Sequence, residues 1–285
     1  MLTKKVNLYE YWKIHQEDGM AGNLTGWYAS TPLAVSKKRH KPAVLILPGG
    51  GYSHTSDRES EPIALQFVAK GYVAFVLEYS VAPFGFPTSL REAAMAMRYI
   101  RENAADFEIN PNMIAAIGFS AGGHLCGTLG TMYDCAEVAD LGEPKLLRPD
   151  VLGLCYPVAV SWGRTNNASF QNLTKGNVFL KERLSLERLV RKDMPPVFLW
   201  HTRDDAVVPC RNSLILSVAL EEAGVPFSLH IYRHGPHGLA TANELAYETW
   251  KLPDISWDVP DWFDAELCFF KEIGFKIIDD EETAC

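Results

Sequence analysis

The stretch Gly118-Phe119-Ser120-Ala121-Gly122 carries a serine between two glycines, in the spacing that nucleophilic serines adopt on a sharp turn. The apolar run 113–118 before it predicts a buried strand, and the helical spacing of apolar residues at 125–129 predicts a helix after it. Small residues could also make a tight turn without any chemistry. A serine that ends a strand and begins a helix, however, has its hydroxyl clear of the sheet, where it could attack a carbonyl carbon.

A serine nucleophile needs a base, and the base needs a carboxylate that fixes its tautomer and stabilises its charged form. Asp204 and Asp205 follow the apolar run 197–201, well after Ser120 in the chain. Two adjacent aspartates could instead cap a helix or pair with Arg203. In a sheet of strands alternating with helices, where a nucleophilic serine ends a strand, the expected order along the chain is serine, aspartate, histidine. We therefore predict Asp205 as the carboxylate and Asp204 as its substitute.

Two histidines follow the last predicted strand, in the sequence His234-Gly235-Pro236-His237-Gly238. They come after the carboxylate in the chain and lie on a glycine-bounded loop, which suits a mobile proton carrier better than a position inside a strand. We predict His237 as the base and His234 as the alternative. His124, on the helix behind the serine, and His230, inside a strand, receive no catalytic role.

The loop Pro48-Gly49-Gly50-Gly51 directly follows the apolar run 43–47. Successive glycines let backbone N–H groups approach a ligand without a Cβ atom in the way. No Gly-Lys-Ser/Thr follows and the G-x-G-x-x-G pattern is not met, so nucleotide-binding loops of those two kinds are excluded. We therefore predict that the N–H groups of Gly50, Gly51 and Ala121 form an oxyanion hole, rather than a phosphate cradle or a merely flexible turn.

Strands and helices are expected to alternate along most of the chain. Apolar runs predict buried strands at 43–47, 72–77 and 113–118, and further strands at 151–156, 197–201 and 227–232. Helical spacing predicts helices at 61–70, after Pro87, after Ser120, at 213–223 and at 261–273. The alternation predicts an α/β fold, a mostly parallel doubly wound sheet flanked by helices. Loops at the carboxyl ends of such strands meet at one edge, which would bring the four candidate loops together.

We expect one domain over residues 1–285, because the sequence has no internal repeat and no stretch that resembles a linker. Residues 1–40 are mixed in character, and only 24–34 suggest an early strand. Residues 158–194 lack strand patterning and are rich in Asn, Ser, Lys and Arg, so they predict an inserted loop or small lid.

The composition argues against two classes of partner. The chain has 285 residues and a formal net charge of −8, and its one basic cluster is the short run Lys37–His40. We therefore expect neither nucleic acid nor an anionic membrane surface as a partner. No run reaches the roughly 20 apolar residues that a membrane-spanning helix needs.

The cysteines and the N-terminus suggest an intracellular setting. No C-x-x-C pair and no cysteine/histidine spacing of a zinc site occurs, and several of the six cysteines lie inside apolar runs, as reduced buried thiols do. Met1–Tyr11 contains no apolar stretch of signal-peptide length. We expect a cytoplasmic protein with no metal ion and no cofactor.

These motifs together resemble the α/β-hydrolase esterases of the acetyl xylan esterase and feruloyl-esterase-like (BD-FAE-type) group, which is related to the hormone-sensitive-lipase class. The resemblance covers about residues 43–240 and is carried by Pro48-Gly-Gly-Gly-Tyr52, Gly118-Phe-Ser-Ala-Gly-Gly-His-Leu125, Pro195-Pro-Val-Phe-Leu-Trp-His-Thr202, Asp205-Ala-Val-Val-Pro209, His230-Ile-Tyr232 and Gly235-Pro-His-Gly238. It implies an α/β-hydrolase fold and a triad of Ser120, His237 and Asp205.

Three positions depart from the pattern of that group without touching the triad. Pro48 stands where the lipase-like class usually has a histidine before its glycines. Ser80 stands after Tyr79 where an arginine is frequent, and Glu92 replaces a frequent aspartate in the long helix. These differences leave the acyl and alcohol pockets undefined by the resemblance.

The resemblance implies a serine carboxylesterase that cleaves short-chain acyl esters, acetyl first, on carbohydrates or other alcohols through an acyl-enzyme. Tyr52, His54 and Trp162 are candidates for substrate contacts. The expected partner is a small-molecule ester, with an acetylated oligosaccharide as one form, and the oligomeric state stays open with a homodimer as one option. The alternatives are a prolyl-oligopeptidase-like peptidase, a general lipase or esterase of the same fold, and a catalytically silent hydrolase-fold binding protein.

Overall fold

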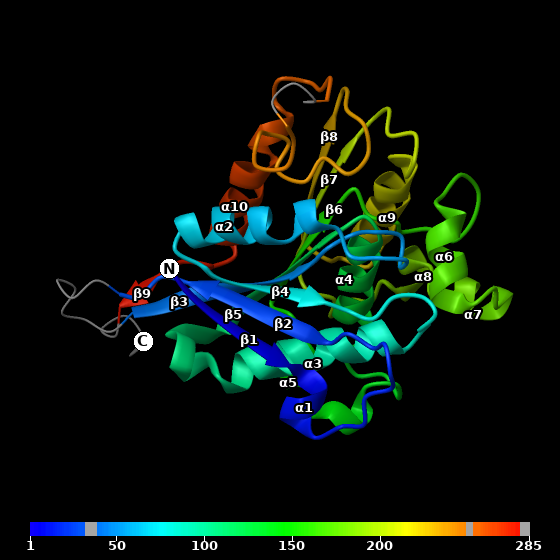
Figure 1. The fold of residues 1–285 in the computed structure, drawn as a ribbon. Coiled ribbons are helices and arrows are strands. Elements are labelled where there is room, and N and C mark those ends of the chain that lie inside the picture. The colour runs from blue at the N-terminus through cyan, green and yellow to red at the C-terminus, as the bar shows by residue number, and fades with distance from the viewer. Residues whose placement is uncertain (32–38, 249–252, 280–285) are drawn as a thin grey trace.

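The computed structural model describes residues 1–31, 39–248 and 253–279. Within these ranges nine strands form one sheet that is flanked by helices (Figure 1). The strands are β1 (Leu2–Asn7), β2 (Asn23–Tyr28), β3 (Arg39–Leu47), β4 (Val73–Glu78), β5 (Ile109–Phe119), β6 (Val151–Cys155), β7 (Val197–Thr202), β8 (Phe227–Tyr232) and β9 (Ile278–Asp279). The α-helices are α1 (Leu8–Trp12), α2 (Glu61–Ala69), α3 (Thr88–Glu102), α4 (Ala121–Met132), α5 (Pro144–Leu147), α6 (Asn167–Thr174), α7 (Val178–Arg183), α8 (Leu186–Leu189), α9 (Arg211–Glu222) and α10 (Trp262–Glu272).

The order of the strands places the loops that follow β3 and β5 at the centre of one sheet edge. The order is β1-β2-β4-β3-β5-β6-β7-β8, with β9 paired to β3. Strands β3 to β8 run parallel to one another, whereas β1, β2 and β9 pair antiparallel. The chain leaves β3 in one direction to form β4 and returns on the other side as β5, so the winding reverses there. Ligands bind at such a switch point, beyond the carboxyl ends of β3 and β5.

Helices cover both faces of the sheet, and this explains why the central strands such as β3 are apolar on both sides. Helices α2 and α10 pack on one face with strand residues such as Val44 and Ile46, and α3, α4 and α9 pack on the other with Leu45 and Leu47. Figure 1 shows α2 and α10 on one side of the sheet and α3 on the other. A strand buried on both faces has no polar side to alternate, which is why β3 lacks period-two patterning.

The predicted α/β fold and its six strands are confirmed; β8, at the sheet edge, is mostly half-buried, and β5 extends further toward its N-terminus than predicted. The N-terminal strand β1 and helix α1 are not among the predicted elements. The reason is that β1 is an edge strand whose first four side chains are exposed, so it carries no apolar pattern. Residues 32–34 of the predicted strand 24–34 lie outside the described residues, and β2 ends at Tyr28.

Residues 158–194, here named the roof segment, contain the three short helices α6, α7 and α8. The segment is fastened to the main body along its length. The Asn172 side-chain amide donates to the Gly51 carbonyl at 2.8 Å, and the His124 Nε2 atom lies 2.7 Å from the Leu184 carbonyl. Burial lowers the pKa of His124 to about 4, so that imidazole is neutral at ordinary pH and donates Nε2–H to Leu184.

The predicted basic run Lys37–His40 and the six predicted free cysteines are described only in part. Lys37, Lys38 and Cys285 lie outside the described residues. The other five cysteines are free thiols, and Cys126 and Cys155 are buried. Over the described ranges, no helix is both long enough and apolar enough to cross a lipid bilayer.

Candidate active site

Ser120 sits on the sharp turn between β5 and α4, in the backbone conformation that such a turn demands. Its φ is 53° and its ψ is −115°, a strained combination for a residue with a Cβ atom. The turn tolerates no bulk beside it: a Cβ at Gly118 would lie 2.1 Å from the Gly122 carbonyl oxygen, and one at Gly122 would lie 2.0 Å from the Leu47 carbonyl oxygen. The two glycines are therefore a steric requirement of the turn that presents the hydroxyl.

The Ser120 hydroxyl, the His237 imidazole and the Asp205 carboxylate form one hydrogen-bonded chain. Ser120 Oγ lies 2.8 Å from His237 Nε2, and His237 Nδ1 lies 2.6 Å from Asp205 Oδ2. A carboxylate only accepts, so Nδ1 carries the proton and Nε2 is left to accept the serine hydrogen. The structure thus brings together three residues that stand far apart in the sequence, in the geometry of a general base and a nucleophile.

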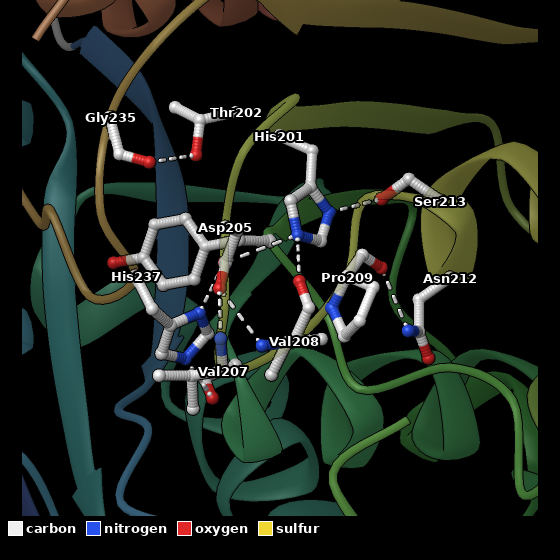
Figure 2. A network of polar contacts seen from close by, with 12 residues as sticks. His201, Thr202, Asp205, Val207, Val208, Pro209, Asn212, Ser213, Gly235 and His237 are labelled. Atoms are coloured by element: carbon white, nitrogen blue, oxygen red, sulfur yellow. Dashed lines mark hydrogen bonds and ion pairs between the residues drawn. The ribbon is translucent and has the colours of Figure 1, made fainter. Parts of the chain in front are cut away.

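Asp205 is buried and fully engaged. Its Oδ1 accepts the backbone N–H groups of Val207 and Val208, each at 2.9 Å, while His201 Nε2 lies 3.3 Å from Oδ2. Figure 2 shows His201 and His237 approaching this carboxylate from two sides. Burial by itself would raise the pKa of Asp205, but the hydrogen bonds from the two histidines outweigh it and hold that pKa well below its usual range. Asp205 therefore stays ionised and keeps His237 in one tautomer.

A buried carboxylate, Glu59, links the glycine loop to the loop after β8 that carries His237, here named the histidine loop. Sequence reasoning missed this residue. Glu59 is 3% exposed; one of its oxygens accepts the Gly49 N–H at 2.7 Å and the other accepts the Tyr156 hydroxyl at 2.7 Å. The Tyr156 ring packs edge-on against His237 with centroids 5.1 Å apart, and its oxygen accepts the Ala240 N–H. The signal was weak because Glu59 lies in a polar stretch, among residues of the kind usual on a solvated surface.

The glycine loop after β3 lies beside the serine with its backbone exposed to the site. Gly50 has φ 123° and Gly51 has φ 63°, conformations that favour glycine. A Cβ at Gly50 would lie 2.1 Å from the His54 carbonyl oxygen, so no larger residue fits. Ala121 is the first residue of α4, where an N–H has no partner within the helix. This placement suits the predicted oxyanion hole of Gly50, Gly51 and Ala121, whose role stays a prediction.

A cavity of about 200 Å³, lined mostly by glycines and polar residues, opens over the Ser120 hydroxyl. His237, Gly50 and Gly51 line it, and so does His54, a predicted substrate contact. Apart from Val207, its lining consists of glycines and of polar or charged side chains, completed by Ser56, Arg58, Glu59, Asn166, Ser169 and Gly238. Such a lining accommodates small polar groups better than a long acyl chain.

The structure corrects two of the predicted substrate contacts. The Tyr52 side chain is 3% exposed and points into the core, where its hydroxyl lies 2.8 Å from His124 Nδ1. Trp162 lies on the roof segment but does not line the cavity of Ser120; it is exposed, its Nε1–H donates to Glu187, and the Arg211 guanidinium lies 5.6 Å from its ring centre. Both aromatic side chains contact neighbours away from the Ser120 cavity, and spacing in the sequence could not show this.

The alternative residues form a separate pair that does not reach the serine. His234 Nδ1 contacts Asp204 Oδ2, and His234 Nε2 lies 3.2 Å from Asp254 Oδ2. His230 lies inside β8, as predicted from its strand position. In the part of the chain that the structure describes, no group of three or more His, Cys, Asp or Glu side chains could hold a metal ion.

The three departures from the expected pattern all make local contacts behind the glycine loop. The Pro48 carbonyl accepts the Tyr79 hydroxyl at 2.6 Å. Ser80 donates through both its N–H and its hydroxyl to Glu92, at 2.5 Å each, and Tyr9 donates to the same carboxylate at 2.8 Å. The Glu92 carboxylate therefore binds Ser80 just beyond the end of β4. This glutamate–serine pair stands where an aspartate and an arginine are frequent in the resembled group.

Comparison with known proteins agrees with this geometry. The family described as BD-FAE matches residues 32–144. The crystal structure of an acetyl ester-xyloside bifunctional hydrolase from Caldicellulosiruptor lactoaceticus is 34% identical, with a TM-score of 0.80 over 95% of this chain and 97% of that one. Likeness over nearly the whole of both chains extends the family relationship beyond the matched segment.

Two curated relatives are longer proteins. Endo-1,4-beta-xylanase B of Butyrivibrio fibrisolvens is 35% identical over 76% of this chain, and an acetylxylan esterase of Xylanibacter ruminicola is 31% identical over 75% of it. The chain spans only 35% and 44% of their respective lengths. Together with the sharp turn at Ser120, the glycine loop and the Ser–His–Asp arrangement, these similarities lead to one conclusion: the chain belongs to the BD-FAE family of α/β-hydrolase-fold esterases.

Proposed function

We propose that this protein is a serine carboxylesterase that hydrolyses short-chain acyl esters, acetyl first, on carbohydrate alcohols. The observation that carries the proposal is the hydrogen-bonded chain from Ser120 Oγ through His237 to the ionised Asp205. Nothing in that chain is specific to sugars. The carbohydrate part is supported by the hydrogen-bonding side chains that line the cavity and by the names of the relatives, which include an acetylxylan esterase.

The reaction would proceed in two halves. Ser120 attacks the ester carbonyl carbon while His237 Nε2 takes its proton, and the N–H groups of Gly50, Gly51 and Ala121 hold the oxyanion. His237 then gives that proton to the leaving alcohol, and the acyl group remains on Ser120. Water, deprotonated by the same imidazole, releases the acid and restores the serine.

The small volume of the cavity favours short acyl esters over the substrates of the alternative enzymes. A lipase needs an apolar channel for a long acyl chain. Among the described residues that line the cavity of about 200 Å³, Val207 is the one with an aliphatic side chain. A peptidase of the prolyl-oligopeptidase type and a silent binding protein would use the same fold differently. Neither alternative has an observation of its own in its favour.

The test is ester hydrolysis with Ser120→Ala as the blank. We expect 4-nitrophenyl acetate to be cleaved best in a series from acetate to octanoate, and acetylated xylo- or manno-oligosaccharides to release acetate. Ser120→Ala should lose at least about 10⁴-fold in kcat. Full ester hydrolysis by Ser120→Ala would disprove the proposal, a preference for octanoate would favour the lipase, and cleavage of prolyl peptides alone would favour the peptidase.

A further inference from the structure

A guanidinium shares the cavity with the serine, and the mechanism does not use it. Arg58 lies in a short 3₁₀ turn (Asp57–Glu59) and lines the same cavity as Ser120 and His237. One of its terminal nitrogens would lie 3.7 Å from a Cβ built on Gly238. The cation is thus beside the residue that follows the base.

The guanidinium is held in place rather than left on a free side chain. Its central carbon lies 5.0 Å from the centre of the Tyr247 ring, and the Tyr247 hydroxyl donates to the Gly238 carbonyl at 2.7 Å. Tyr247 therefore fastens the Arg58 cation to the histidine loop. A stacked guanidinium keeps its charge and most of its N–H donors, and prior ordering lowers the entropy lost when it binds a partner.

No carboxylate among the described residues lies within ion-pair distance of this guanidinium, although the chain is strongly acidic. Arg91 and Arg191, by contrast, each pair with aspartates at 2.6 Å or less. The two acidic neighbours of Arg58 are turned elsewhere: Glu59 accepts from Gly49 and Tyr156, and Asp57 accepts from the Arg58 backbone N–H. The cavity accordingly presents a cation that forms no ion pair with a described carboxylate, although the buried Glu59 lines the same cavity.

We propose that Arg58 binds a carboxylate on the alcohol half of the substrate, so that the enzyme prefers acyl esters of acidic sugars or other hydroxy acids. The inference rests on the proposed esterase function. The alcohol half is chosen because the base must hand its proton to the leaving alcohol, and Arg58 lies beside Gly238, next to that base. Planar guanidinium donors match a carboxylate in two parallel hydrogen bonds.

The experiment compares esters that differ only in charge. One pair is 4-acetoxybenzoate and its methyl ester, with the charge on the alcohol half; the other is mono(4-nitrophenyl) succinate and its methyl ester, with the charge on the acyl half. We expect wild type to prefer the anionic member of the first pair in kcat/KM. Arg58→Gln should lower that anionic-to-neutral ratio about 5- to 10-fold, as expected for one charge-assisted contact from a side chain that is exposed before substrate binds, and Arg58→Lys should restore part of it.

Arg203→Gln is the matched control, because Arg203 is exposed at the same sheet edge but lines a different cavity. It removes the same charge and should leave the ratio unchanged, whereas a general electrostatic effect would lower it in both variants. An unchanged ratio in Arg58→Gln, or a preference confined to the succinate pair, would overturn the proposal. Failure of the esterase function itself would look different, because then neither member of either pair would be cleaved in a Ser120-dependent way.

Discussion

Two histidine–aspartate pairs stand side by side on the loops after β7 and β8, and only one of them can serve a nucleophile. In the inner pair the Asp205 side chain is 0% exposed and the His237 side chain 14%; in the outer pair Asp204 and His234 are 35% and 45% exposed. The residue types are the same, and the positions differ by one and three residues. What differs is the partner of the second ring nitrogen.

His237 has a carboxylate on Nδ1 and a hydroxyl on Nε2, so one nitrogen is free to accept a proton. His234 has a carboxylate on each nitrogen, Asp204 on one side and Asp254 on the other. The hydrogen bond to Asp204, together with the two negative charges, raises the pKa of His234 and favours its doubly protonated form. With a carboxylate on each ring nitrogen, His234 has no nitrogen turned toward a nucleophile from which it could take a proton.

The largest expected effect separates the two histidines. His237→Asn should lower kcat for 4-nitrophenyl acetate by at least about 10⁴-fold, because His237 is the one imidazole among the described residues that is hydrogen-bonded to Ser120 Oγ. His234→Asn should stay within about twofold of wild type. Unfolding midpoints measured on both variants show whether either has lost its fold. Comparable losses in the two variants would mean that the pairs are not functionally distinct.

The next effect separates the two aspartates. Asp205→Asn should lower kcat about 10³- to 10⁴-fold, since an amide that donates to His237 Nδ1 would force the proton onto Nε2 and block acceptance from the serine. Asp204→Asn should change kcat only a few-fold, because Asp204 contacts His234 and the Gly235 N–H. Steady-state rates from pH 5 to 9 provide the comparison. An active Asp205→Asn would shift the carboxylate role to another residue.

A smaller effect tests why the inner pair is so well ordered. Glu59→Leu removes the acceptor of the Gly49 N–H and of the Tyr156 hydroxyl. The glycine loop and the histidine loop should then both be less precisely positioned beside Ser120. We expect kcat to fall about 10- to 100-fold with little change in KM, less than the loss of a direct oxyanion donor. Glu59→Gln can still accept from Gly49 and donate to Tyr156, and should recover most of the rate.

A merely structural role for Glu59 would give another pattern. In that case Glu59→Leu would lower the unfolding midpoint while the folded fraction kept the wild-type kcat. Tyr156→Phe offers the matching control, because it removes the second hydrogen bond and leaves the ring against His237.

The smallest effect concerns the pH dependence of stability at the outer pair. A histidine whose pKa is raised in the folded state stabilises the protein below its unfolded pKa of about 6.5, and this contribution disappears as the pH rises through the folded value. His234→Asn should therefore lower the melting temperature slightly at pH 5.5, by about 2 °C or less, and not at all near pH 9. A difference that grows toward alkaline pH would contradict this assignment.

The sequence was sufficient for the parts of the site that depend on strand order. Ser120, Asp205 and His237 could be placed together because each follows a strongly apolar run, and parallel strands end at a common edge. The glycine loop could be placed for the same reason. The choice of Asp205 over Asp204 agrees with the structure, in which the Asp205 carboxylate turns inward to His237.

Contacts made by side chains from distant segments could not be predicted in this way. Tyr52 follows the glycines and was expected to face the substrate, but its ring is buried against His124. Glu59 stands in a polar stretch, and only the folded chain reveals that its carboxylate is buried between two loops. Strand β1 was missed because an exposed edge gives no apolar alternation.

The fastening of the roof segment has a consequence for how substrate arrives. Both Asn172 and Leu184 are hydrogen-bonded to the body, and Ala159 and Val160 donate to the Asn212 side chain at the segment's start. We therefore expect the roof segment to keep its place when the protein meets a lipid–water interface. Hydrolysis of triacetin should then follow one unbroken saturation curve across its solubility limit, and a jump in rate where emulsion first forms would show that the roof segment does open.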